Sequence, residues 1–302
     1  MQSASTTPIV SRRRFLATGA VLAAGAVAVQ YGVSGSAVAA PDLTPLKSAS
    51  GKVKFQLGIA SYTYRSFDRA KTIAFTKQLG LSHLCFKDMH LSLKATEAEC
   101  AAAAKECEEA GIKLSGCGVV GFGKPEDIDN AFRYARAAGM ETIVCSISKP
   151  ELADDLLKYL DAKLKEPERA DIYAAFHNHG PGDRVFPTTK EVYEKVKDLH
   201  PHIGFCADIG HTVRIGGDAV ADLTRCPERL FDVHMKDVTS ADKAGVSCVA
   251  GTGVIDLPKV IKALVEIGYS RRLSFEYEEN AKDPQPYVAQ TVGYVQGIAR
   301  VM

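Results

Sequence analysis

The chain has 302 residues, of which 46% are hydrophobic and 24% charged, and its formal net charge is +1. This length and composition suit one large domain with a well-buried core. Proteins that bind nucleic acid usually carry a basic excess or a basic stripe, and this chain has neither, so no nucleic-acid partner is expected.

Residues 1–39 have the features of a twin-arginine (Tat) signal peptide. Paired arginines lie in residues 11–16, an uncharged stretch rich in Ala, Val and Gly follows, and residues 37–39 offer a small-residue cleavage site. Glycine and serine make this stretch poorly apolar for a permanent span, so no stable membrane anchor is expected. We expect the Tat translocase to be a partner during export, and the mature protein to be periplasmic or extracellular.

The cysteines all follow this leader, and none has CxxC spacing. Secreted chains often pair their cysteines, but the leader resembles those that direct export of proteins already folded in the reducing cytoplasm. Most of the cysteines are therefore predicted to be buried free thiols.

After a linker at residues 40–52, short apolar runs alternate with helical patterns, which is typical of repeated βα units. Eight strands are predicted, at residues 53–60, 82–86, 112–117, 141–147, 172–176, 203–207, 230–235 and 272–277. Helices are predicted at residues 70–79, 97–110, 128–138, 151–164, 190–199, 257–267 and 287–301. This α/β pattern favours a single (β/α)8 TIM barrel over residues 53–302, with a doubly wound open sheet as the structural alternative.

The last four predicted strands each end in side chains that can bind a metal ion. In a closed parallel barrel these strand ends meet at one mouth, where catalytic residues lie. Imidazole and carboxylate groups together suit one divalent ion, such as Mn²⁺, Co²⁺, Zn²⁺, Mg²⁺ or Fe²⁺. We predict a metal site with one ligand from each strand end: His177, Asp208, His234 and Glu276.

Each of these side chains also has an ordinary structural alternative. Asp208 could cap a helix, His234 could be a hydrogen-bonded core histidine, and Glu276 could be a surface carboxylate. His177 and His179 share a face, so either could be the ligand. We choose His177 because it is nearer the strand, and His179 would then orient a ligand or contact the substrate.

Side chains two positions apart on a strand share a face, and this rule extends the site. Lys236 is expected to face the mouth together with His234, and Glu278 together with Glu276. Glu276 is the leading catalytic base, and Glu278 or His179 would return or relay the proton. Lys236 could reach a substrate oxygen.

Weaker signals come from other strand ends. Tyr62 follows the first strand and could offer an aromatic surface to a sugar, while Lys87 and His90 follow the second. Together with His211 these are the predicted substrate contacts, although polar groups at such positions often only cap helices. The glycine-rich segment at residues 251–253 fits an ordinary turn better than a phosphate site.

Four motifs carry a family resemblance: HNHG at 177–180, D-x-G-H at 208–211, H-x-K-D at 234–237 and E-Y-E at 276–278. In this order they resemble the sugar phosphate isomerase/epimerase family of the xylose-isomerase-like TIM-barrel superfamily, which also includes endonuclease IV. The resemblance covers about residues 53–302 and implies one divalent metal at the four predicted ligand positions. Ketose 3-epimerases have a glutamate, both ligand and base, where this chain has His177. The nuclease has a D-x-H pair where this chain has residues 251–253, so nuclease activity is not expected.

The resemblance and the metal constellation imply an isomerase or epimerase acting on a sugar or keto-sugar. The metal would be a Lewis acid that acidifies a C–H group and stabilises an enediolate. Elimination from the same intermediate would instead make the protein a lyase or dehydratase on 3-keto sugars or glycosides, which the histidine substitution and the export signal favour as the second interpretation. A non-catalytic carbohydrate-binding barrel is the third, and inward-facing Glu276 and Lys236 argue against it. The sequence leaves the substrate, the native metal and the oligomeric state open.

Overall fold

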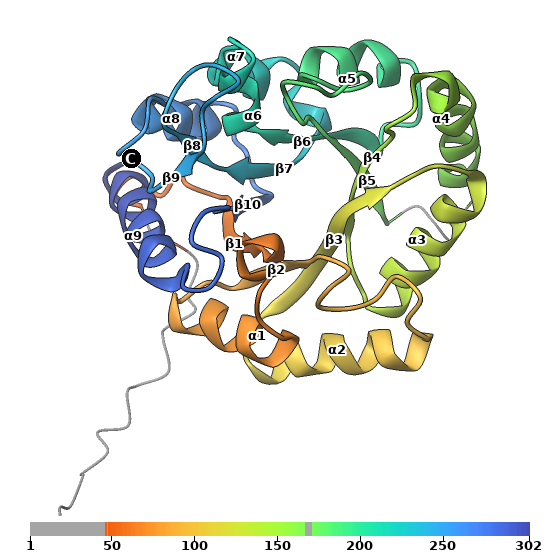
Figure 1. Ribbon diagram of the computed structural model, residues 1–302, viewed down its shortest axis with the longest axis horizontal. Helices are drawn as coiled ribbons and strands as arrows, with labels where there is room; N and C mark the ends of the chain where they lie inside the picture. Colours follow the sequence, from red (N-terminus) through yellow and green to blue (C-terminus); the bar gives the residue numbers. More distant parts are fainter. Residues whose placement is uncertain (1–45, 47, 167–170) are drawn as a thin grey trace, which may run out of the picture. The chain divides into compact units, whose positions relative to one another are not determined.

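A computed structural model describes residues 46, 48–166 and 171–302 (Figure 1). The predicted signal peptide and the linker residues 40–45 and 47 lie outside the described residues, so the export prediction stays a prediction. Within the ranges that are described, no helix combines the length and the apolar character needed to cross a membrane.

Eight parallel strands close into one barrel, which confirms the predicted fold and rules out the open sheet. In chain order they are β1 (Gln56–Ala60), β2 (His83–Phe86), β3 (Lys113–Gly121), β4 (Thr142–Ser146), β5 (Tyr173–His177), β6 (Ile203–Asp208), β7 (Leu230–Met235) and β10 (Arg272–Phe275). The ring closes where β1 pairs in parallel with β10. Because all strands run in one direction, their carboxyl ends meet at one mouth.

Seven longer helices surround the strands in the described part of the chain (Figure 1). They are α1 (Arg69–Gln78), α2 (Glu97–Glu109), α3 (Pro125–Ala137), α4 (Pro150–Leu164), α5 (Thr189–Val196), α8 (Leu257–Glu266) and α9 (Gln285–Val301). All seven were predicted, with small differences at their ends. Threonines cap two of them. The side chain of Thr96 accepts from the Glu99 amide at the start of α2, and that of Thr188 accepts from the Lys190 amide at the start of α5. In return, the side chains of Glu99 and Glu191 accept from the amides of the two threonines.

Several short elements were not predicted. They are η1 (Ser61–Tyr64), α6 (Ile209–Arg214), α7 (Ala219–Thr224), η3 (Pro227–Arg229) and an antiparallel ribbon of β8 (Asp237–Val238) and β9 (Ser247–Cys248). Elements of this length are too short to show a hydrophobic period, and tertiary contacts fix them instead. Most of them lie beyond strand ends, so they shape the mouth of the barrel.

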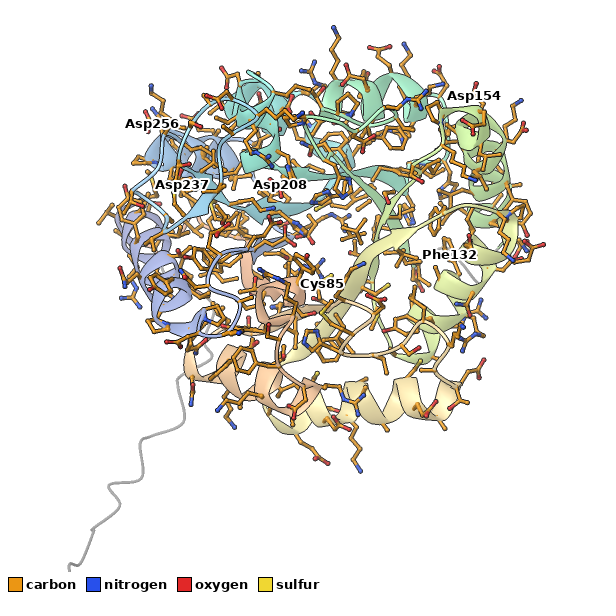
Figure 2. All side chains as sticks on the ribbon, viewed as in Figure 1. Cys85, Phe132, Asp154, Asp208, Asp237 and Asp256 are labelled. Atoms are coloured by element: carbon orange, nitrogen blue, oxygen red, sulfur yellow. The ribbon has the colours of Figure 1, made fainter. Side chains whose placement is uncertain are left out.

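The apolar core has two parts. A large cluster packs the strands against the helices. A small cluster fills the barrel interior, and its buried members are Cys85, Val144, Ala175, Cys206 and Phe231. Figure 2 shows Cys85 within the ring of strands. The cysteines are free thiols, and all except the half-buried Cys248 are buried, as predicted.

A buried polar network occupies the opposite, amino-terminal end of the barrel. Arg272, the first residue of β10, forms an ion pair with Asp232 of β7. Its guanidinium also donates to Ser115 Oγ and to Ser274 Oγ, both at 2.8 Å. All four side chains are buried. The polar groups at this end are therefore satisfied by one another, whereas at the mouth His177 Nδ1 and His234 Nε2 are buried without a hydrogen-bond partner.

Candidate metal centre and cavity

The ends of four neighbouring strands bring the predicted metal ligands together. His177 ends β5, Asp208 ends β6, His234 lies near the end of β7, and Glu276 follows β10. One ligand atom from each residue lies within 4.8 Å of the others, and all four residues are buried. Figure 2 labels Asp208 at this position.

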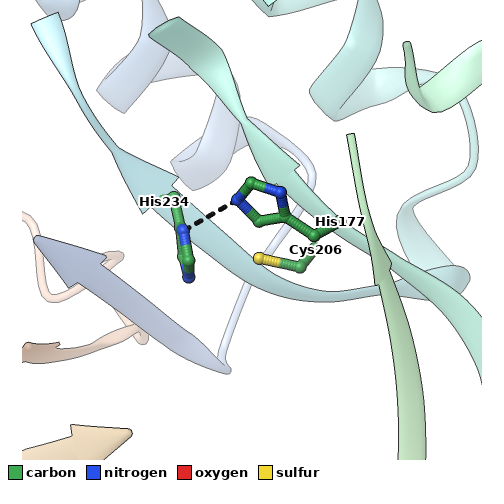
Figure 3. Close-up of side chains that lie close together, drawn as sticks. All are labelled: His177, Cys206 and His234. Carbon is green, nitrogen blue, oxygen red and sulfur yellow. Dashed lines mark hydrogen bonds between the residues drawn. The ribbon is translucent and has the colours of Figure 1, made fainter. Parts of the chain in front are cut away.

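The contacts inside this cluster join groups that ordinarily accept hydrogen bonds or bind metals. His177 Nε2 lies 3.0 Å from His234 Nδ1, as the dashed line in Figure 3 shows, and 3.5 Å from Asp208 Oδ2. His234 Nδ1 lies 3.2 Å from Glu276 Oε2. Asp208 Oδ2 is buried, and it faces both imidazoles and the ammonium of Lys236, which lies 2.9 Å away. A buried carboxylate oxygen beside two imidazole nitrogens is part of a donor set that suits a divalent cation.

Asp208 is held in place by its own backbone surroundings. Its Oδ1 atom accepts from the amide of His211 at 2.8 Å and so caps α6. Asn178 of the preceding strand end bonds both sides of the Asp208 backbone, accepting from its amide at 2.9 Å and donating to its carbonyl at 3.2 Å. The cap and this bridge leave Oδ2 to face His177 and Lys236. Asn178 was not among the predicted site residues, since alternation along a strand places its side chain opposite those of His177 and His179.

The glycines of two motifs make room for the site. Gly180 has a φ of +66°, and a Cβ atom there would lie 2.5 Å from the His211 carbonyl oxygen. A Cβ atom at Gly210 would lie 2.8 Å from Lys236 Cγ. The first glycine lets the segment after β5 approach α6, and the second lets the Lys236 stem pass over the start of that helix.

Lys236 reaches the carboxylates of the cluster from β7, as the strand alternation predicts. Its Nζ atom lies 2.9 Å from Asp208 Oδ2, 2.8 Å from Glu276 Oε2 and 2.7 Å from Glu278 Oε1. The lysine is buried, so these carboxylates rather than water balance its charge. A divalent cation in the cluster would compete with this ammonium for the same two oxygens.

Burial and neighbouring charges favour the metal-binding protonation state of three of the four groups. The exception is His234, where burial opposes the charge but the Glu276 carboxylate outweighs it and raises the pKa of the imidazole, so a cation would have to displace a proton there. Burial opposes charge on Asp208 and Glu276, but the Lys236 ammonium outweighs it and holds the pKa of both carboxyls well below the usual value. Burial also lowers the pKa of His177 well below its usual value, so this imidazole is neutral at pH 7. Ionised carboxylates and neutral imidazoles are the forms that bind metals.

A cavity of about 330 Å³ opens above the cluster. Its lining residues are Tyr62, Lys87, Gly118, Val119, His177, His179, His211, Glu276 and Glu278. The structure thus brings three of the four predicted substrate contacts to one cavity. His90 is not among the lining residues, because its ring is buried between Ser61 Oγ at 2.8 Å and the Tyr64 carbonyl at 3.3 Å.

Two predicted residues lie at the rim of the cavity. His179 has a side chain that is 39% exposed, and its Nδ1 atom lies 3.4 Å from Asp183 Oδ2, which orients the ring. His211 Nε2 lies 4.0 Å from Asp208 Oδ2. His177 lies deeper in the barrel than His179. Among the described residues, a ring nitrogen of His177, and none of His179, lies within 4.8 Å of the other three ligand atoms.

The segment at residues 251–253 is held by a carboxylate of this protein. Asp237 accepts from the amides of Gly251 at 2.9 Å and Gly253 at 3.0 Å. It also accepts from the Ile255 amide at 3.2 Å. The backbone donors that a phosphate would need are thus already used, which fits the predicted turn.

The chain resembles known proteins in sequence and in fold. A family model described as xylose isomerase-like TIM barrel matches residues 73–296. The rhizopine catabolism protein MocC of Rhizobium meliloti is 28% identical over 142 residues, which are 42% of this chain and 43% of that protein. Inosose dehydratase of Geobacillus thermodenitrificans is 31% identical over 129 residues, 37% of this chain and 42% of that protein. The chain therefore spans about half the length of the curated relatives it matches. Among solved structures, D-psicose 3-epimerase with D-tagatose from Clostridium cellulolyticum H10 has a TM-score of 0.64 at 14% identity, covering 81% of this chain and 99% of that one, which is a likeness of fold.

Proposed function

The chain belongs to the xylose isomerase-like TIM barrel family, and from this premise we propose that it is a metal-dependent lyase that eliminates water or an alkoxy group from a polyhydroxylated ketone. The proposal rests on the unequal chemistry of the two sides of the cavity. The carboxylates that line it, Glu276 and Glu278, both follow β10, whereas the imidazoles of His177, His179 and His211 come from the β5 and β6 side.

This asymmetry suits elimination better than epimerisation. An epimerase removes a proton on one face of a carbon and returns it on the other, so two similar bases across the cavity serve it well. An elimination needs a base at the carbon and a different group that gives a proton to the leaving oxygen. A carboxylate facing imidazoles supplies that pair. Isomerisation or epimerisation shares the first proton transfer and is the alternative outcome of the same chemistry.

The four-residue cluster fits a divalent cation by its donor set, since two buried carboxylates and two buried imidazoles bring their ligand atoms within 4.8 Å of one another. His177, Asp208, His234 and Glu276 would hold the ion. When bound, the ion would polarise the ketone oxygen and lower the free energy of negative charge developing on it.

We assign the proton transfers to side chains at the rim. Glu278 takes the proton from the carbon beside the ketone, because Glu276 is engaged in the cluster. The C–H electron pair forms the new double bond, and the bond to the oxygen on the next carbon breaks. His179, oriented by Asp183, donates a proton to that oxygen, which leaves as water or an alcohol. Lys87 and Tyr62 hold the other hydroxyl groups.

A cavity of about 330 Å³ is of a size for one monosaccharide or cyclitol ring. Location outside the cytoplasm, if the leader acts as proposed, favours an unphosphorylated substrate. A binding protein without catalysis would gain nothing from an ionised carboxylate beside a buried lysine.

The test is incubation of the Mn²⁺- or Co²⁺-loaded protein with an inosose and with 3-keto-glucosides in D2O. Elimination gives a product that has lost water or its aglycone and absorbs in the ultraviolet as a conjugated carbonyl. Recovered sugar that carries solvent deuterium without such loss would replace this proposal by isomerisation or epimerisation. Tight binding with neither outcome would support the binding barrel.

Matched glutamates identify the base. Glu278→Gln is expected to lower kcat by at least about a hundredfold, since general base catalysis contributes factors of this order. Glu279→Gln changes the neighbouring exposed carboxylate in the same way and should leave kcat unaltered. Equal activity of both variants would move the base to Glu276.

Lys236→Met is expected to raise the affinity for a divalent cation by about tenfold, because it removes a positive charge from the oxygens the cation would bind. The metal-free variant should unfold at a lower temperature than the wild type, since buried carboxylates lose their counter-charge. The rise in Tm on adding Mn²⁺ should therefore be larger in the variant. Calorimetric titration and thermal unfolding measure both effects, and Lys87→Met, whose ammonium donates to the Val119 carbonyl instead, is the control. Unchanged affinity in the Lys236 variant would place the cation elsewhere.

A further inference from the structure

A cysteine thiol lies directly beneath the predicted metal ligands. Cys206 is two residues before Asp208 on β6, so both side chains point into the barrel. In the strand register Cys206 pairs with His177 of β5 and with Asp232 of β7. It is fully buried and belongs to the small interior cluster. The thiol therefore forms the floor of the layer that holds the ligands.

Donor atoms of His177, Cys206 and His234 lie within 4.8 Å of one another (Figure 3). This soft-donor set shares both histidines with the upper set, in which Asp208 and Glu276 complete the group. Beyond the nitrogens that face each other, His177 Nδ1 and His234 Nε2 are buried without a hydrogen-bond partner. The histidine pair thus has unsatisfied nitrogens, and one nitrogen of each ring lies within 4.8 Å of a fully buried sulfur atom.

We propose that the soft-donor set is a second site for a thiophilic cation such as Zn²⁺ or Cd²⁺, exclusive with occupation of the upper set. Thiolate and imidazole ligands select such ions, whereas carboxylates suit Mn²⁺ and Mg²⁺. Because the two sets share their histidines, one ion at a time can use them fully. When an ion binds in the soft-donor set, the Cys206 thiol releases its proton to solvent, and the thiolate becomes the ligand.

This inference rests on the proposed function for its consequence, which is that thiophilic ions displace the working ion and inhibit the enzyme. An ion in the soft-donor set would engage His177 and His234, so these histidines would no longer be available to an ion held by Asp208 and Glu276. The substrate cavity would then lack a cation at the height where a ketone oxygen can reach it. The enzyme would be active with an ion such as Mn²⁺ in the upper set and inhibited by Zn²⁺ or Cd²⁺ in the soft-donor set.

Cadmium binding to the purified protein tests the site without reference to activity. Wild-type protein with one equivalent of Cd²⁺ is expected to show the ultraviolet charge-transfer band of a cadmium–thiolate bond. Asp208→Asn, which alters only the upper set, should keep this band, and Cys206→Ser should lose it. Cys85→Ser, a change of another interior thiol in the same cluster, is the matched control and should keep it.

Competition experiments measure the preference between the two sets. Zn²⁺ should bind Cys206→Ser at least about tenfold more weakly than wild type, since even outer-shell partners of a metal contribute that much. Mn²⁺ affinity, followed by electron paramagnetic resonance, should be the same in both proteins. A band that survives in Cys206→Ser, or stoichiometric Cd²⁺ binding to wild type without a band, would overturn the proposal.

Two safeguards keep the outcome decisive. If Cys206→Ser does not fold, cadmium NMR of the wild-type protein still distinguishes a sulfur ligand from an all-nitrogen-and-oxygen site, and absence of the sulfur ligand overturns the proposal. The thiolate band and the turnover of ketones are separate measurements. A protein that turns over no ketone would contradict the proposed function, and its thiolate band would still decide whether Cys206 binds the ion.

Discussion

Replacing Asp208 by asparagine is expected to lower the affinity for Mn²⁺ or Co²⁺ by at least about a hundredfold and to abolish turnover. The variant keeps the Oδ1 acceptor that caps α6 at the His211 amide. It replaces Oδ2, the buried oxygen that faces the imidazoles, by an amide group that cannot bind a cation. The amide would also leave Lys236 with one carboxylate fewer. Metal content of the purified protein and calorimetric titration measure the loss.

Asp218 provides a matched control for this substitution. It caps α7 as Asp208 caps α6, accepting from the amides of Val220 and Ala221, but it is exposed and outside the cluster. Asp218→Asn should therefore keep full metal affinity and activity. An Asp208→Asn protein that retains the wild-type metal content would remove Asp208 from the site, and the four-ligand centre with it.

The metal cluster was within reach of sequence analysis because strand geometry is local. Side-chain direction alternates along a strand, so the sequence alone places Lys236 on the side of His234. What the sequence cannot supply is depth, because His177 and His179 have the same parity. The register between β5 and β6, which pairs His177 with Cys206, sets which imidazole lies among the ligands. That register depends on contacts between distant segments.

Other features escaped prediction for related reasons. Cys206 lies two positions before Asp208, so strand alternation places both side chains on the same side. It was not predicted as a ligand, because a cysteine in an apolar strand resembles an ordinary core residue. His90 follows β2 as Lys87 does, yet a bond to Ser61 turns its ring into the core. Asn178 was not predicted for the site, yet it bridges two strand ends through the Asp208 backbone. In each case the partner lies far away in the chain, so local pattern carries no information about it.

The network at the opposite end of the barrel is expected to dominate stability. Asp232→Leu should lower the free energy of unfolding by about 3–5 kcal/mol, because it leaves the buried Arg272 guanidinium without its carboxylate. The backbone at Gly116 already makes room for this guanidinium, since a Cβ atom there would lie 2.7 Å from Arg272 Nη1. The surrounding backbone therefore packs closely against the guanidinium, and an unpaired charge there would be strongly destabilising. Urea unfolding followed by circular dichroism measures the loss.

A double variant separates the ion pair from the space it fills. Asp232→Leu combined with Arg272→Met replaces both charges by apolar groups, so the double variant should be more stable than the Asp232→Leu single variant. Asp154→Ala breaks the exposed pair with Lys195 and should leave the free energy of unfolding nearly unchanged. If Asp232→Leu lowers the free energy of unfolding as little as Asp154→Ala does, water reaches the Arg272 guanidinium, and the network does not dominate stability. If the double variant is no more stable than the single one, the loss comes from packing at this end and not from an unpaired charge.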